Sequence, residues 1–593
     1  MQFDSIFEYT KSEEVAFSLP ISMDGWDWNF PEHIKTAFFY KHGRLLTGNE
    51  DNKPVKNIVR PILNLQYRSE GFDVKDIVLF LNDSKVYYKS FLIKKFHEKW
   101  VRENKIDTFI DELVESYVDY GGALVKRVNK VKPEVVPLQS IVFCDQTDIL
   151  SGPIGIKHFF SPDQLREMES YGWGKKSNGA TATIEDFITL AREYKIPNKN
   201  VGQQNKTPGK YIEIYEVHGT FPESFLKDSE SDKYVSQLHI IGFYTDINGV
   251  KQGLTLFKGK ETEGPFKFIK RDPIYGRALG FGGVEELSEP QVWTNYGEIR
   301  KKELMDAASK TVHLTNDDAF YARNKNLNNV DNNQVLVVAE GKEVRQMDTV
   351  PRSIALFDKA VNEWWEYART IGAAQEAIMG EQPPAGTPFA SVQFQEMESH
   401  SLHEYRKGKL AAFLGEIYQD WIIPYLSKEV SKGQEFLTEL ELEELQQIAD
   451  NLIVNEANKF IKEKILNGES VKEEEVELHK ERTREQFMKG GNKKFIKIFE
   501  GEMKKVPIDV EVNVAGKQKY LSAITDKLVN VFRQILAAPQ ILDDPRMTKI
   551  FNQILEYSGL SPIDFYSKPK VPIQSPALPA AAEQLEALVP ISK

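Results

Sequence analysis

Four side chains in the second half of the sequence have types and spacing that could bind a metal ion. Glu396, His400, His403 and Glu404 recur at steps that would put three or four of them on one face of a helix. Imidazole and carboxylate groups are common zinc ligands in hydrolases. We favour a solvated helix surface instead, because metal sites usually recruit a ligand from a second element. A metal-dependent hydrolase therefore stays a rival hypothesis, and we predict no metal site.

Other catalytic signatures are missing from the sequence. There is no GxxxxGK motif followed by Ser or Thr, so a phosphate-loop NTPase is not indicated. HExxH and GxSxG are also missing, so neither a zincin nor a nucleophile elbow is indicated. We expect a protein that is not an enzyme and requires no cofactor.

The composition is that of a folded protein with an acidic balance. The 593 residues hold 76 Lys and Arg against 88 Asp and Glu, a net charge of -12 that does not favour tight nucleic-acid binding. With 35 Phe, 23 Tyr and 8 Trp, a mainly disordered chain is excluded. The single cysteine, Cys144, excludes a disulfide within one subunit.

The sequence shows no targeting or membrane-spanning pattern. Acidic residues occupy the first positions where a signal peptide would need a basic region, and no run of about 18 apolar residues occurs. We therefore expect no export signal, no membrane insertion and folding in the cytoplasm.

Residues 1–283 show mixed helical and strand periodicity. The segment 106–120 has apolar residues at helical spacing and is followed by Gly121 and Gly122, which predicts a helix with a glycine end. Alternating segments follow, and an Asn-Gly pair at 248–249 indicates a hairpin turn. The polar stretch 171–207 is predicted to be a loop. This part is expected to be an α+β body.

Long helices dominate from residue 284 onward. One helix is predicted over 284–311, then a short segment over 312–351 with a strand in QVLVVAE, and a second helix over 352–379. Prolines and glycines in 380–393 exclude a helix there.

A third helix is predicted over residues 394–423, ending at Pro424. Residues 434–505 are charged and mostly helical, which is typical of solvated helix faces. Further amphipathic helices lead to a Pro/Ala-rich tail over 566–593.

This order of elements resembles that of the portal proteins of tailed bacteriophages. The similarity is greatest to portals of short-tailed phages, with the crAss-like group as one candidate. Five local stretches carry the resemblance: ESYVDYGGALVKRV, VVPLQSIVFCDQTD, DPIYGRALGFGGVEEL, IMGEQPPAGTPFASVQFQEMES and PIDVEVNVAGKQKYLSAITDKLVNVFRQILAAP.

The resemblance implies an α+β portal-like fold with an α/β wing body, long stem helices, a small α/β clip and a helical crown. Its parts would be the wing body 1–283, stem helices 284–311 and 352–379, the clip 312–351, the tunnel loop 380–393, a long helix and second wing part 394–515, the crown 516–565 and the tail 566–593.

The resemblance also implies a function and partners. Portals are rings, here expected to have twelve subunits, at one capsid vertex of the virion. Double-stranded DNA passes through the ring during packaging and ejection. The expected partners are further copies of this chain, the major capsid protein, the terminase large subunit that drives packaging, and head-tail adaptor or tail proteins. The alternative is a soluble virion scaffold or adaptor without a DNA channel.

Residues are assigned to these roles by position. The tunnel loop contains no Lys or Arg, so it could touch DNA without capturing phosphates. Its residues are Glu381, Gln382, Pro383, Pro384, Gly386, Thr387, Pro388 and Phe389. The candidate DNA-facing stem cations are Arg300, Lys301, Lys302 and Lys310, and the clip cations are Arg323, Lys325, Lys342 and Arg345.

Two of these assignments have simpler alternatives. The stem cations are more simply read as solvated helix charges or salt bridges between subunits. Trp364 and Trp365 point about 100° apart on a helix, so one of them could face a neighbouring subunit. Burial of both in the subunit's own core is the simpler expectation.

Overall fold

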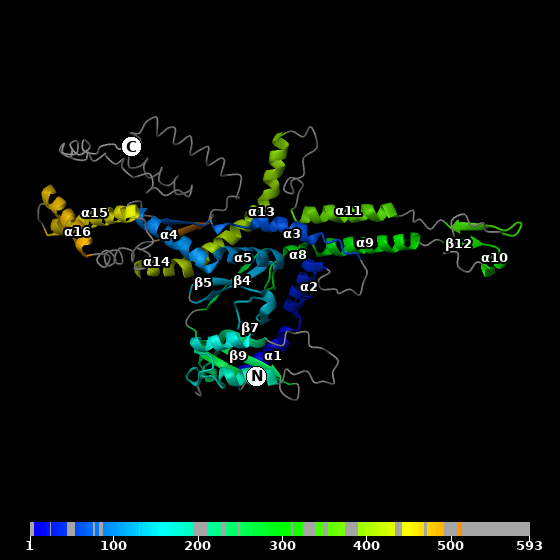
Figure 1. Cartoon of the computed structure of the whole chain (residues 1–593), viewed down its shortest axis with the longest axis horizontal. Helices are drawn as coiled ribbons and strands as arrows, with labels where there is room; N and C mark the ends of the chain where they lie inside the picture. The colour runs from blue at the N-terminus through cyan, green and yellow to red at the C-terminus, as the bar shows by residue number, and fades with distance from the viewer. Residues whose placement is uncertain are drawn as a thin grey trace, which may run out of the picture. The chain divides into compact units, whose positions relative to one another are not determined.

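The structure is a computed structural model that describes most of the chain up to residue 512 (Figure 1). The described residues are 5–23, 25–43, 54–74, 77–81, 87–129, 131–193, 211–226, 233–245, 250–261, 264–309, 312–323, 338–347, 354–373, 389–432, 442–467, 471–490 and 508–512. The chain divides into two units, the first formed by Met1–Val74 with Lys105–Ile417, and the second by Lys75–Asn104 with Tyr418–Lys593. Residues 75–104 thus belong to the second unit, although the sequence predicts one body over 1–283.

The first unit begins with short helices, a two-stranded sheet and a longer helix. These elements are α1 (Ile6–Phe17), β1 (Ile21–Met23), β2 (Trp26–Trp28), α2 (Phe30–His42), α3 (Val59–Glu70) and α5 (Ile106–Tyr120). Helices α2 and α3 pack against the longer helix α5. Helix α5 has the predicted bounds and ends at Gly121, whose φ of 75° is the left-handed conformation that glycine adopts without strain. Its apolar stripe, which includes Phe109, Leu113 and Tyr117, is buried.

A five-stranded antiparallel sheet forms the largest layer of this unit. Its order is β10-β9-β8-β7-β6, built from β6 (Ile141–Phe143), β7 (Ile154–Phe160), β8 (Ile212–Pro222), β9 (Tyr234–Thr245) and β10 (Lys251–Lys260). Helix α1 packs on one face, where Phe7 contacts Phe243 and Tyr9 contacts Phe221. Helices α6 (Pro162–Glu167) and α7 (Ile184–Glu193) lie against the sheet as well.

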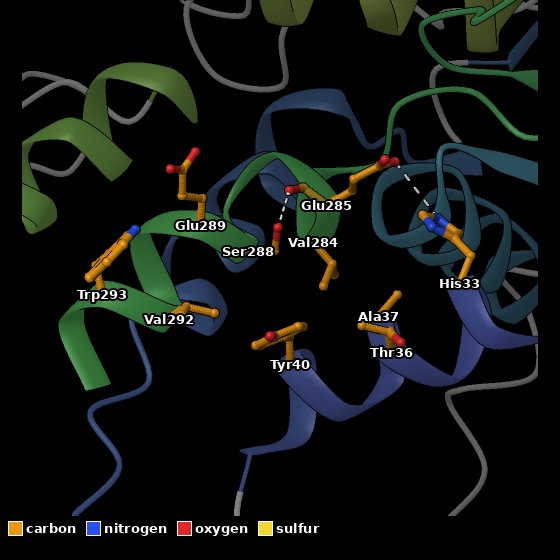
Figure 2. A pocket seen from close by; sticks show the side chains of 10 residues that line it. All are labelled: His33, Thr36, Ala37, Tyr40, Val284, Glu285, Ser288, Glu289, Val292 and Trp293. Carbon is orange, nitrogen blue, oxygen red and sulfur yellow. Dashed lines mark hydrogen bonds and ion pairs between the residues drawn. The ribbon is translucent and has the colours of Figure 1, made fainter. Parts of the chain in front are cut away.

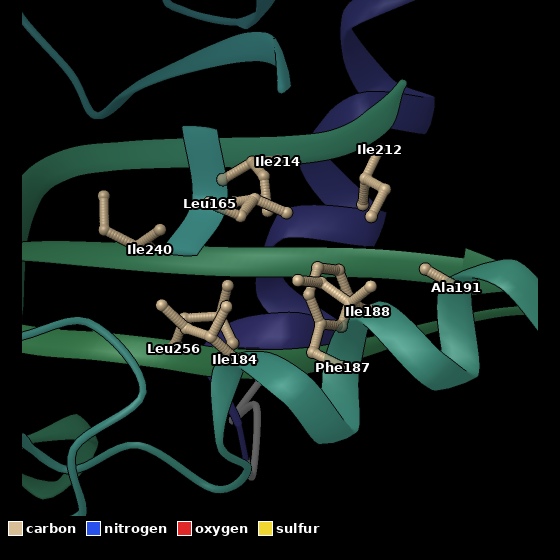
Figure 3. Close-up of a cluster of buried hydrophobic side chains, with 9 residues drawn as sticks. All are labelled: Leu165, Ile184, Phe187, Ile188, Ala191, Ile212, Ile214, Ile240 and Leu256. Atoms are coloured by element: carbon tan, nitrogen blue, oxygen red, sulfur yellow. The ribbon is translucent and has the colours of Figure 1, made fainter. Parts of the chain in front are cut away.

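Helix α7 corrects the prediction of a loop over 171–207. Ile184, Phe187, Ile188 and Ala191 recur at helical spacing and pack on Ile212, Ile214, Ile240 and Leu256 of the sheet (Figure 3). Thr183 begins the helix by accepting a hydrogen bond from the Asp186 N–H. The polar composition of the surrounding residues hides this short amphipathic pattern. The segment just before α7 also covers the edge strand β10, because the Thr181 N–H donates a hydrogen bond to the Thr255 carbonyl.

A three-stranded antiparallel sheet joins α5 to the long helices. Its order is β11-β4-β5, with β4 (Gly122–Val128), β5 (Lys132–Val136) and β11 (Phe266–Lys270). Short 3-10 helices connect parts of both sheets: η3 (Leu138–Ser140), η4 (Met168–Tyr171), η5 (Lys176–Asn178) and η6 (Glu223–Phe225).

The remaining elements of the first unit are mainly helical. They are α8 (Gly283–Glu286), α9 (Ser288–Ala308), β12 (Val312–Thr315), α10 (Asp318–Arg323), β13 (Val344–Met347), α11 (Ile354–Ile371) and α13 (Phe389–Ile417). Helix α13 begins at Phe389, inside the segment 380–393 that was predicted to exclude a helix. The reason is that Pro388 is the last proline of the segment, and a proline just before a helix leaves its hydrogen bonds intact. Predicted loop residues 381–388 lie outside the described residues.

The second unit combines a two-stranded sheet with helices. Strand β3 (Ile77–Leu81) pairs antiparallel with β14 (Ile508–Val512), so segments more than 400 residues apart in sequence are hydrogen-bonded. Its helices are α4 (Tyr87–Asn104), a π-helical turn (Tyr418–Ile422), α14 (Ile423–Lys432), α15 (Leu442–Leu466) and α16 (Glu473–Gly490). Pro424 does not end the predicted helix there, because the π-helical turn just before it continues into α14, which runs to Lys432.

The α+β class is confirmed, since helices combine with several small sheets. Helices α15 and α16 form an antiparallel pair within the charged segment 434–505, held by a Phe460–His479 stack and a Lys464–Glu475 ion pair of 2.7 Å. The predicted crown 516–565 and tail 566–593 lie outside the described residues. Among the helices that the structure describes, none has the length and apolar character required to cross a membrane.

Candidate functional site

Helices α9 and α11 form an antiparallel hairpin within the first unit (Figure 1). Trp293 stacks on Trp364, Gly297 faces Val361, and Lys301 forms an ion pair with Asp358. The residue numbers of the contact partners increase along α9 and decrease along α11, so the two helices pack antiparallel. These helices lie within the ranges 284–311 and 352–379, over which the sequence predicts long helices, but α9 begins at Ser288 after the separate α8 and α11 ends at Ile371.

Gly297 allows the two helices to approach closely. A Cβ atom built on Gly297 would lie 2.7 Å from the Val361 Cγ2 atom, which is too short for a real contact. Both residues are buried. The hairpin therefore depends on the absence of a side chain at this position.

Aromatic side chains gather on the hairpin. The Trp293 and Trp364 rings are nearly parallel, with planes 11° apart and centroids 6.0 Å apart. Tyr296 meets Trp293 edge-on, and Tyr367 meets Trp364 in the same way. Trp293, Tyr296 and Tyr367 are each almost half exposed, at 46%, 48% and 48%. These three residues and Trp364 form the aromatic cluster, and exposed apolar side chains that lie together are typical of interaction surfaces.

The predicted stem cations that the structure describes are all paired with acids of the same chain. Arg300 lies 2.8 Å from Glu303, Lys301 2.5 Å from Asp358 and Lys302 3.0 Å from Asp306. The hydrogen bond to Asp358 raises the pKa of Lys301. Lys310 lies outside the described residues.

The far end of the hairpin leads into a small α/β unit at the predicted clip. Strands β12 and β13 pair antiparallel and α10 packs on β12. The buried Asp317 carboxylate accepts hydrogen bonds from the Ala319 and Phe320 N–H groups and caps α10.

The predicted clip cations are only partly described. Lys342 donates to the Asn316 carbonyl at 2.9 Å, Arg345 pairs with Glu343, and both cations are exposed. Nothing is described of the Arg323 side chain or of Lys325. Most of the predicted strand QVLVVAE also lies outside the described residues, and its last three residues are not in a strand.

Two of the stretches that carry the sequence resemblance, ESYVDYGGALVKRV and DPIYGRALGFGGVEEL, meet at the base of the hairpin. The Gly121 carbonyl accepts hydrogen bonds from both the Arg271 and Gly280 N–H groups. A Cβ atom on Gly121 would lie 2.4 Å from the Gly280 carbonyl oxygen, so the contact is backbone against backbone. The end of α5 therefore fixes the start of the segment that enters α8 and α9.

A buried cluster of charges lies beside this contact. Arg271, which is fully buried, donates to Glu70 at 2.8 Å and 3.3 Å. Arg406 of α13 donates to Asp272 at 2.7 Å and 3.0 Å, and lies 3.6 Å from Glu286 of α8. The cluster thus connects α3, the end of β11, α8 and α13.

The pKa values in this cluster follow from burial and pairing. Burial by itself would raise the pKa of Glu70, but hydrogen bonds from His403 and Arg271 outweigh it and lower that pKa. Burial dominates at Glu286 and raises its pKa. Glu70 is therefore the carboxylate that anchors the cluster.

His403 corrects the expectation of a solvated helix surface. It is buried in the cluster, with Nδ1 3.1 Å from Glu70 Oε1 and Nε2 3.3 Å from the Ala373 carbonyl oxygen at the end of α11. Glu404 is exposed, and the side chains of Glu396 and His400 lie outside what is described. Within the described residues no group of His, Cys, Asp and Glu side chains could hold a metal ion.

A hollow of about 380 Å³ opens between α2 and the α8–α9 segment (Figure 2). Tyr40, Val292 and Trp293 form much of its apolar wall. His33 lies at one side, 3.8 Å from Glu285, and burial lowers its pKa. Trp293 belongs to both this hollow and the aromatic cluster, so the two apolar surfaces are continuous.

Sequence reasoning missed the buried charge cluster. One signal for it exists in α3, where Gln66 and Glu70 continue the apolar stripe formed by Val59, Ile62 and Leu63. Polar residues at such positions indicate buried hydrogen-bonded groups. Arg271 and Arg406, the partners of Glu70, carry no comparable local signal.

Comparisons with known proteins gave only weak similarity. No protein-family model and no curated protein matches this chain. A chain from the neck of an empty gene transfer agent particle, computed with C6 symmetry, is similar over 70% of this chain and 87% of its own, with 9% identity and a TM-score of 0.33. A chain from the virion of a native gene transfer agent particle is similar over 69% and 86%, with 8% identity and a TM-score of 0.33. These similarities carry no argument about function.

Proposed function

We propose that this protein is a portal subunit that assembles into a ring at one capsid vertex and conducts double-stranded DNA. The observation that carries the proposal is the α9–α11 hairpin, which holds a small α/β unit between its two long helices and continues into the long helix α13. This is the arrangement of stem, clip and long helix that the sequence resemblance implies.

The charges of the hairpin fit a channel that DNA can slide through. Each phosphate that a protein neutralises adds a salt-dependent binding term, so a sliding channel must not hold many phosphates. The stem cations Arg300, Lys301 and Lys302 each have a carboxylate partner in their own subunit. This pairing weakens their electrostatic attraction for DNA phosphates. The cations would then keep passing DNA centred without capturing it.

The aromatic cluster is our candidate for the contact between neighbouring subunits. Half-exposed Trp and Tyr side chains are the usual anchors of protein interfaces. Trp364 also stacks on Trp293 of its own subunit, so it would serve both the hairpin and the interface. Trp365 is half-buried on the same helix and is our second candidate for this contact between subunits.

The proposal assigns partners to the remaining parts. The clip, with exposed Lys342 and Arg345, would meet the terminase large subunit during packaging and then a head-tail adaptor or tail protein. The body of the ring would contact the major capsid protein. The ATPase activity would belong to the terminase, and the subunit itself would be no enzyme.

Electron microscopy of the purified protein, with native mass spectrometry, tests the proposal. We expect closed rings, with twelve subunits by mass and a central opening of roughly 20 Å or more, wide enough for duplex DNA. Monomers or dimers at all protein concentrations, both alone and after addition of capsid protein, would contradict it and favour the adaptor alternative.

A further inference from the structure

Two largely buried carboxylates, one on β8 and one just after β10, face the same histidine. His218 of β8 is 5% exposed, and its Nε2 lies 3.0 Å from Glu216 Oε1. Its Nδ1 lies 3.1 Å from each carboxylate oxygen of Glu261, just after β10. A carboxylate can only accept hydrogen bonds, so both ring nitrogens must donate. With both carboxylates ionised, this geometry therefore favours a doubly protonated His218.

This group lies where the five-stranded and three-stranded sheets meet. Lys126 of β4 forms an ion pair with Glu216, and the ring of Phe266 at the start of β11 packs edge-on against His218, with centroids 4.9 Å apart. The Arg127 N–H also donates to the Pro265 carbonyl beside this contact. His218 is thus a link between residues of both sheets.

The proton on His218 balances the buried charges. Glu216 and Glu261 supply two negative charges, and Lys126 and protonated His218 supply two positive charges. A neutral His218 would leave a net negative charge in a buried site and one carboxylate without its donor, which is costly at low dielectric.

Other titratable groups around His218 do not replace it. His158 of β7 donates to Glu216 at 2.9 Å but is 36% exposed, so water can take over its role. His239 of β9 bonds to Gln237, and burial lowers its pKa to about 3, so it stays neutral. The charge of Lys258 of β10 lowers the pKa of His239 further.

We propose that His218 is a proton-operated latch that holds the two sheets of the first unit together. When it is protonated, it bridges Glu216 and Glu261 beneath Phe266. When it loses its proton, the buried carboxylates repel each other and the contact between the sheets loosens. This inference does not depend on the proposed portal function.

The sign of the pH dependence follows from the pKa shift. Burial by itself would lower the pKa of His218, but hydrogen bonds to Glu216 and Glu261 outweigh it and raise that pKa. A histidine whose pKa is raised in the folded state stabilises that state fully at pH values below its unfolded pKa of about 6.5. This stabilisation is lost as the pH rises through the folded pKa. The latch is therefore closed below about pH 6.5 and opens as pH rises through the raised folded pKa of His218.

Hydroxyl-radical footprinting of the full-length protein, read by mass spectrometry, tests the latch. We expect oxidation of His218 and Phe266 to rise several-fold between about pH 6 and pH 9. Phe187, buried between α7 and the same sheet, serves as internal reference and should stay protected throughout. Unchanged oxidation of His218 and Phe266 over this range would overturn the proposal.

Variants separate the latch from general loss of structure. His218→Gln should leave Phe266 oxidised at the same raised level at both pH values, while His158→Gln should keep the wild-type pH response. Glu261→Gln removes one of the two negative charges beside His218 but keeps an acceptor oxygen, so the transition should move to lower pH. This variant remains informative if His218→Gln fails to fold. A pH response that persists in His218→Gln, or a transition that Glu261→Gln does not move, would also overturn the proposal.

Discussion

Trp293 and Trp364 stack with their ring planes 11° apart and join the two helices of the hairpin. The two residues are 71 positions apart in sequence, and the segment between them includes the small α/β unit. The stack therefore joins α9 to α11 in one register, with Trp293 46% exposed and Trp364 half-buried.

Trp364→Ala should lower the free energy of unfolding by about 1–2 kcal/mol, because it removes an aromatic pair from a half-buried site. Trp364→Phe should recover part of this loss. Chemical denaturation measures the stability, and native mass spectrometry of the same samples measures ring assembly. If Trp364→Ala and Trp365→Ala both unfold the protein and neither changes assembly of the folded fraction, their role at the subunit interface is wrong.

Gly297→Ala should destabilise the hairpin even though alanine favours helices. The new Cβ would lie 2.7 Å from Val361 Cγ2, and overpacking of this kind costs about 1–3 kcal/mol. Adding Val361→Ala should relieve the clash, so the double variant should be more stable than the sum of the single changes implies. A double-mutant cycle by thermal unfolding checks this, and additive effects would argue against the close contact.

Lys301→Glu should place two like charges side by side, because Lys301 pairs with Asp358. Exchanging both residues, as Lys301→Glu with Asp358→Lys, should restore the pair and recover the loss of up to about 1 kcal/mol. The DNA role is tested by combining Lys301→Glu with Lys302→Glu in packaging and retention assays. Reduced packaging is expected if these cations centre DNA, and unchanged packaging by the double variant would exclude that contact.

Glu70→Gln should remove the acid-sensitive anchor of the buried charge cluster. The pKa of Glu70 is lowered in the folded protein, so its contribution is present above the unfolded pKa of about 4.3 and lost as pH falls through the folded value. Leaving Arg271 without its carboxylate should cost about 3–5 kcal/mol near neutral pH. The difference from wild type should shrink in acid, as denaturation curves between about pH 3 and pH 7 would reveal. A pH-independent difference would contradict this assignment.

The sequence by itself determined the elements whose signals are local. The helix over 106–120 and its glycine end follow from apolar spacing and from the need for a left-handed residue at Gly121. The two long helices on either side of a short segment were also visible, because amphipathic periodicity needs no partner to be recognised. The α+β class follows from the same patterns.

Only the tertiary structure decided which distant residues meet. Glu70, Arg271, His403 and Arg406 come from three separate parts of the chain, and no local pattern predicts that they share one buried site. His403 was expected on a solvated surface because its neighbours in sequence are polar, yet its burial depends on α3 and the end of α11. Periodicity reports which face of an element is apolar, whereas pairing of buried charges is set by the packing of elements that are far apart in sequence.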